Sequence, residues 1–66
     1  MTLVISQDRT YTFTRFNSRV RIDMDNTHTN VTIKDGLDFF KTMTENYGFK
    51  VQSGNPKEFF NERKLA

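Results

Sequence analysis

The chain lacks cysteine and tryptophan, and it holds one histidine, one proline and three glycines among its 66 residues. Without cysteine it can form neither disulfides nor thiolate metal sites. The glycines, Gly36, Gly48 and Gly54, are too far apart for a glycine-rich phosphate loop. A chain this short has a small core and marginal stability. We therefore expect a single domain, 1–66, that gains stability from self-association or from a partner.

Long hydrophobic runs are also missing. The longest apolar run is Leu3-Val4-Ile5, whereas a membrane-crossing helix needs about 20 residues. Near Met1 there is no basic stretch followed by an apolar one, which is the pattern of a signal peptide. These absences predict a protein without a membrane partner and with a cytoplasmic location.

Charge of neither sign dominates. Ten basic residues face eight acidic ones, for a net charge of +2. Residues 1–34 carry five basic and three acidic groups, and residues 35–66 carry five of each. This surplus is smaller than that of a dedicated nucleic-acid binder. Nucleic acid is therefore an alternative partner and not the leading one.

The segment RTYTFTRFNSRVRID, residues 9–23, alternates between two kinds of side chain. This period of two predicts strands at about 10–16 and 19–25, joined by a two-residue turn at Asn17-Ser18. Residues paired across the hairpin share a face, and a shift of one residue would mix the two sets. The predicted apolar face holds Tyr11, Phe13, Val20, Ile22 and Met24, with Arg15 as its charged member.

Neighbouring segments extend this sheet. TLVIS at 2–6 continues the apolar face on one side, and NVTIK at 30–34 continues it on the other. The polar segment DNTHT between the third and fourth strands is predicted to be a hairpin loop. FKV, at 49–51, is a candidate for a short extra strand.

Two helices follow from periodicity and capping signals. Leu37, Phe40, Met43 (or Thr44) and Tyr47 form one helical stripe, which predicts a helix at about 36–47. Asp35 suits its N-cap, and Gly48 suits the left-handed residue after its end. Asn55 as N-cap with Pro56 behind it predicts a short helix at about 56–64. The fold class is therefore α+β: an antiparallel three- to four-stranded meander covered on one face by a helix, plus a short C-terminal helix.

The residues needed for catalysis or for metal binding are scarce. His28 lies in a polar segment, and a metal site needs several ligands at set spacing. DMDNTH begins like a calcium loop, but His28 stands where the motif needs glycine and Lys34 where it needs glutamate. The single histidine and the three scattered serines offer no nucleophile beside an oriented base. We expect no enzyme, no cofactor and no metal.

The polar face of the sheet is the first candidate contact surface. It can be an ordinary solvated face, since exposed charges are normal. Alternatively, arginine beside an exposed aromatic residue is typical of interface hot spots and of single-stranded nucleic-acid sites. Phe39 either widens the core or joins the C-terminal phenylalanines in an apolar patch. The candidate partner-binding residues are Phe16, Arg19, Arg21, Lys34, Phe39, Phe59 and Phe60.

These observations favour a small non-enzymatic binding protein that modulates or inhibits a macromolecular partner, with a host protein as the leading partner. One alternative is a nucleic-acid-binding module that uses the basic sheet face. Another is a self-assembling structural subunit, for example a homodimer. In size, in its lack of cysteine and tryptophan, and in its Thr-, Asn-, Lys- and Phe-rich composition, the chain resembles small phage-encoded proteins that occupy a host protein. No motif supports that resemblance, and it assigns no role to any residue.

Overall fold

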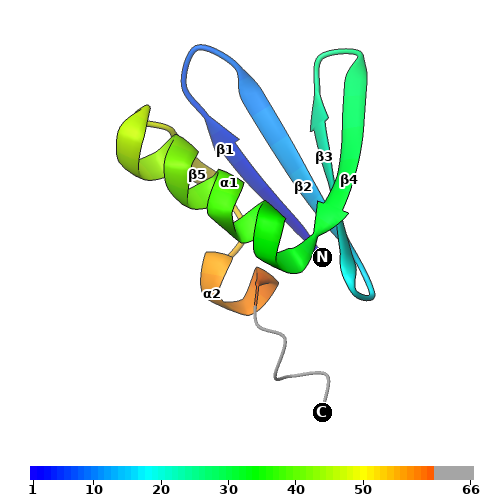
Figure 1. The fold of residues 1–66 in the computed structure, drawn as a ribbon. Helices are drawn as coiled ribbons and strands as arrows, with labels where there is room; N and C mark the ends of the chain where they lie inside the picture. Colours follow the sequence, from blue (N-terminus) through cyan, green and yellow to red (C-terminus); the bar gives the residue numbers. More distant parts are fainter. Residues whose placement is uncertain (61–66) are drawn as a thin grey trace.

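The computed structural model describes residues 1–60, which form one antiparallel sheet and two helices (Figure 1). Along the sheet the strand order is β4-β3-β2-β1-β5. The longer helix, α1, lies across one face of the sheet, and the short α2 lies beside it. The predicted α+β class is confirmed. The elements are β1 (Thr2–Ser6), β2 (Thr10–Phe16), β3 (Arg19–Met24), β4 (Thr27–Thr32), α1 (Ile33–Asn46), β5 (Lys50–Ser53) and α2 (Pro56–Phe59).

The central hairpin has the predicted register. Phe13 pairs with Ile22, and Arg15 pairs with Val20. On the other side of β2, Leu3 pairs with Phe13. Asn17 takes a φ of 53° in the turn, a left-handed conformation that asparagine tolerates better than most residues. The alternating pattern therefore identified both the register and the face that becomes the core.

The fourth strand was predicted wrongly at 30–34. It runs from Thr27 to Thr32, and the preceding connection is a two-residue turn at Asp25-Asn26. Asp25 has a φ of 54°, so aspartate fills the left-handed position of this turn. The remaining residues of the expected loop are mostly β-branched threonines, which favour strands, and they pair directly with β3.

The first helix begins earlier than predicted. Thr32 is its N-cap, and the Thr32 hydroxyl accepts a hydrogen bond from the Asp35 amide at 3.1 Å. Asp35, the predicted cap, therefore lies inside the first turn, where its charge suits the helix dipole. Ile33 and Lys34, which were assigned to the fourth strand, belong to α1. Ile33 is buried in the core.

The helical stripe on α1 is only partly confirmed. Leu37, Phe40 and Met43 pack against the core, but Tyr47 is 60% exposed. Gly48 follows with a φ of 79°, as predicted. The chain then turns back, so that the Phe49 amide donates to the Met43 carbonyl at 3.0 Å.

The C-terminal part closes one side of the core. The extra strand suggested at 49–51 is present with shifted bounds as β5, Lys50–Ser53, and pairs antiparallel with β1. The Asn55 side chain accepts hydrogen bonds from the amides of Lys57 and Glu58, at 3.0 and 3.3 Å, which confirms it as the N-cap of α2. Of the predicted range 56–64, residues 61–64 lie outside the described residues. Phe59 is fully buried.

Arg15, the one charged member of the apolar face, holds α2 in place. Its Nη1 donates to the Phe59 carbonyl at 2.7 Å, and its Nε donates to the Asn17 carbonyl at 3.1 Å. The last carbonyls of a helix lack partners within the helix, so an arginine there satisfies one of them. Arg15, the charged exception in the alternating apolar pattern, therefore links the central hairpin to α2.

Candidate functional site

The two helices leave one end of the apolar sheet face open. The seven-residue β2 spans about 24 Å along its axis, whereas a helix is about 10 Å wide. Next to α1, α2 fills the end of the face near Arg15. At the opposite end, where β1 connects to β2 and β3 connects to β4, the tips of both hairpins extend past α1 (Figure 1). No described helix covers that end.

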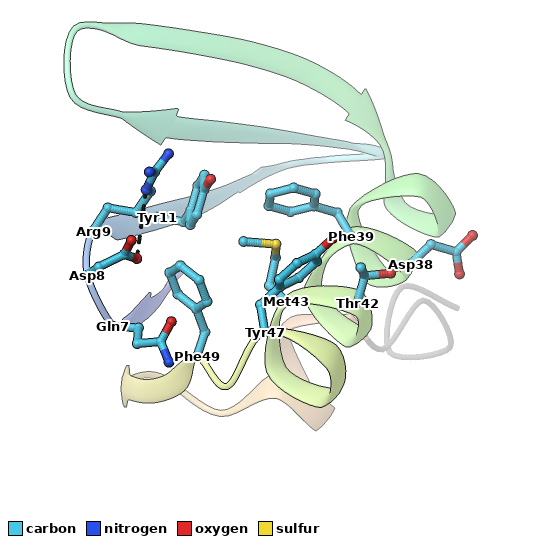
Figure 2. Close-up of a pocket in the computed structure, with 10 residues that line it drawn as sticks. All are labelled: Gln7, Asp8, Arg9, Tyr11, Asp38, Phe39, Thr42, Met43, Tyr47 and Phe49. Atoms are coloured by element: carbon cyan, nitrogen blue, oxygen red, sulfur yellow. Dashed lines mark ion pairs between the residues drawn. The ribbon is translucent and has the colours of Figure 1, made fainter.

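A hollow of about 620 Å³ lies at this open end, between the β1–β2 loop and the second half of α1. We call it the aromatic hollow. Figure 2 shows several of its apolar side chains facing a common space. Its walls are Tyr11, Phe39, Met43, Tyr47 and Phe49, and its rim carries Gln7, Asp8, Arg9, Asp38 and Thr42.

Three of the five wall residues of the aromatic hollow, Tyr11, Phe39 and Phe49, are held by ring packing. Tyr11 meets Phe39 edge to face, with ring centroids 5.2 Å apart, and meets Phe49 at 5.4 Å. Phe39 also contacts Phe13 in the core at 6.0 Å. Such pairs are favourable beyond the area they bury. A ligand would therefore not have to order these three rings.

A second, smaller hollow lies on the other side of Tyr11 and Phe39. Its volume is about 280 Å³, and Met24 and Val31 contribute to its apolar lining beside β4. Tyr11 and Phe39 line both hollows.

The rim of the aromatic hollow carries charges of both signs. Arg9 Nε lies 3.8 Å from Asp8 Oδ1, and both side chains are at least half exposed. An exposed pair of this kind contributes little to stability, so it can exchange for a pair with a ligand. Asp38 adds a negative charge on α1. The rim can thus interact with charged groups on either side of an apolar anchor.

The predicted polar face forms in part. Phe16 is 51% exposed and lies directly opposite Arg19, as predicted. Arg21 lies on the same face, but its Nε is 3.0 Å from Asp23 Oδ1, so its charge is compensated. Lys34 was placed on this face wrongly, because it belongs to α1. The structure does not bring the three basic residues Arg19, Arg21 and Lys34 together on one strand face.

The apolar patch of Phe39 with the C-terminal phenylalanines, one of the two alternatives for Phe39, does not form. Phe59 and Phe60 are buried, and their ring centroids lie 6.3 and 6.2 Å from that of Phe13. They dock on this protein and are covered when it is folded. Phe39 widens the core, as one of the two interpretations held, but its ring also lines the aromatic hollow.

Sequence reasoning missed the aromatic hollow. Tyr11 was assigned to the core face of the sheet, Met43 and Tyr47 to the helical stripe, and Phe49 to a candidate extra strand. The available signal was geometric, because one helix is too narrow to cover strands of seven residues. Their residue types alone do not distinguish a covered apolar face from a partly open one.

Comparison with known proteins adds no identification: no family model, no curated protein and no solved structure matches this chain. Within residues 1–60 no cluster of three or more histidine, cysteine or acidic side chains is placed to hold a metal ion. Neither described helix is long and apolar enough to cross a membrane.

Proposed function

We propose that this chain is a small non-enzymatic binding protein that modulates or inhibits another protein, and that the aromatic hollow receives an apolar side chain of that partner. The supporting observation is a hollow of about 620 Å³ walled by aromatic side chains and Met43, in which the rings of Phe39 and Phe49 pack on Tyr11. Protein interfaces concentrate their binding energy in such central pockets, which are filled by one or two anchor residues. Preformed walls also lower the entropic cost of binding.

The surroundings of the hollow suit a peptide segment. Tyr47, at the helix end, is 60% exposed and offers a large amphipathic side chain to a partner. Asp38 and Arg9 on the rim can pair with residues that flank the anchor. Charge complementarity at the rim gives orientation and specificity more than affinity. The partner segment would therefore combine an aromatic or aliphatic anchor with charged neighbours.

Selection of a random peptide library against the purified protein tests the proposal, because it does not require an identified partner. We expect the selected peptides to share an aromatic or large aliphatic residue. Tyr47→Ala should weaken their binding about tenfold, a loss of about 1.4 kcal/mol. Phe16→Ala is the matched control, since Phe16 is also a half-exposed aromatic residue but lies on the opposite sheet face. Peptides that tolerate Tyr47→Ala and lose binding in Phe16→Ala would contradict the proposal.

Nucleic-acid binding is the second candidate, supported by the direct pairing of Phe16 with Arg19 on an exposed face. A base can stack on the ring while the guanidinium meets phosphate. The test is a titration with short single- and double-stranded DNA and RNA at about 50 and 200 mM salt, a range in which phosphate contacts weaken steeply. Tight, salt-sensitive binding that is lost in Arg19→Glu but kept in Lys34→Glu would favour this candidate. The leading proposal predicts no such binding.

A further inference from the structure

The two edges of the sheet differ in how they are protected. β5 has four residues, begins with Lys50, and its pairing with β1 changes register between Val4 and Ile5. Short strands, lysine and bulges are the usual devices that prevent an edge from pairing with another chain. The β5 edge therefore has three features that hinder its pairing with another chain.

The β4 edge carries none of these protections. It has six residues, THTNVT, without lysine, arginine, acidic residues or proline. Its pairing with β3 is unbroken from Arg19↔Thr32 to Met24↔Thr27. Residues 27–30 are exposed, and no described element pairs with the outer side of this strand. Within residues 1–60, no further strand uses its outward backbone groups.

We propose that β4 pairs antiparallel with β4 of a second copy of this chain, which joins two five-stranded sheets into one continuous sheet. A two-fold axis perpendicular to the sheet keeps corresponding faces together. In that arrangement either Thr29 or Asn30 lies opposite itself. The proposal concerns the sheet edge and does not depend on the function of the aromatic hollow.

The composition of β4 favours the same strand of a second copy as its partner. If Thr29 lies on the axis, Thr27 meets Val31 and His28 meets Asn30. If Asn30 lies on the axis, Thr29 meets Val31 and His28 meets Thr32. Neither register places like charges of lysine, arginine or acidic residues opposite each other, and the register centred on Thr29 adds a threonine pair, which is favourable across strands. The strand also offers no fixed charge that would select an oppositely charged foreign strand. Association would add stability to a domain whose size limits its own core.

Single cysteines test the geometry, because the chain has none of its own. Directly opposed residues of antiparallel strands have Cα atoms about 4.5–5.5 Å apart, which is within the range for a disulfide. We expect either Thr29→Cys or Asn30→Cys to form a covalent dimer under mild oxidation. Gln52→Cys, exposed on the other edge strand, is the control and should remain monomeric.

Charge substitution at the position that cross-links provides the second test. If this is Asn30, Asn30→Lys and Asn30→Asp should each lose the dimer, and their equimolar mixture should recover it. Light scattering on the wild type should give twice the chain mass of 7.8 kDa. A monomeric mass at all working concentrations without cross-linking at either position would overturn the proposal. So would a dimer that survives both substitutions, or one that cross-links only through Gln52→Cys.

Discussion

Two glycines on either side of β5 hold the backbone in conformations with positive φ, 79° at Gly48 and 92° at Gly54. Their surroundings differ. A Cβ at Gly54 would lie 2.5 Å from the Thr2 carbonyl oxygen, which is rigid backbone of β1. A Cβ at Gly48 would lie 2.9 Å from Nε2 of Gln7, the end of a flexible side chain. Both positions need glycine for φ, but only Gly54 also needs it for space.

We predict that Gly54→Ala lowers the free energy of unfolding by about 3 kcal/mol or more, because backbone strain and a clash with β1 act together. Gly48→Ala should lower it by about 1 kcal/mol, since Gln7 can move away. Urea unfolding of both variants beside the wild type measures the difference. Equal losses would mean that the close approach of Gly54 to β1 is not important for stability.

At the scale of elements, the hairpin of β2 and β3 was predictable because its alternation is strict and a shifted register would expose the core. β4 was misplaced because the choice between a two-residue and a five-residue connection rests on whether Asp25 adopts positive φ. The start of α1 was also predicted wrongly, because Thr32 and Asp35 are both residue types that suit an N-cap. Both connections are compatible with the sequence, and the pairing of β4 with β3 selects the two-residue turn.

The docking of α2 gives a prediction at this scale. Arg15→Leu removes the charged donor of the 2.7 Å hydrogen bond to the Phe59 carbonyl. Bonds from charged groups contribute about 1.5–3 kcal/mol, so we expect a loss of that size in the free energy of unfolding. Arg19→Leu, at an exposed position on the opposite face, is the control and should change stability by less than about 0.5 kcal/mol. Equal effects of the two substitutions would show that Arg15 does not hold α2.

At the scale of the whole molecule, the ring of Phe13 connects the sheet to both helices. Phe13, in the middle of β2, is fully buried. Its ring centroid lies 6.0 and 6.2 Å from those of Phe39 and Phe40 on α1, and 6.3 and 6.2 Å from those of Phe59 and Phe60. The sheet and both helices therefore share one aromatic cluster, and the domain should unfold as a unit.

We predict that Phe13→Ala leaves the chain unfolded at 25 °C. Such a truncation costs about 3–5 kcal/mol, which is comparable to the whole stability of a domain this small. Phe13→Leu keeps most of the volume and should remain folded with a lowered melting temperature. Circular dichroism and one-dimensional NMR distinguish the two outcomes. A folded Phe13→Ala variant would mean that the cluster is less central than its geometry indicates.

The aromatic hollow could not be predicted from the sequence, because it depends on how both helices are placed on the sheet. Tyr11 and Phe49 have the residue types of a core, and they do pack on core rings. Whether they also line an open hollow depends on where α1 crosses the sheet and on which end α2 fills. Those positions follow from the Arg15–Phe59 contact and from the close approach of Gly36 to Val20, neither of which a residue pattern reveals.

The central claim, that the aromatic hollow receives an anchor side chain, is tested most directly by NMR titration with single-residue probes. The probes are the N-acetyl amides of phenylalanine, tryptophan and leucine, with the N-acetyl amide of serine as control. We predict saturable shift changes at Tyr11, Met43 and Tyr47 with the apolar probes and none with serine. These changes should be lost in Thr42→Trp, which fills the hollow from its rim. Shifts that gather instead around Phe16 on the opposite face, or no saturable shifts at all, would contradict the account.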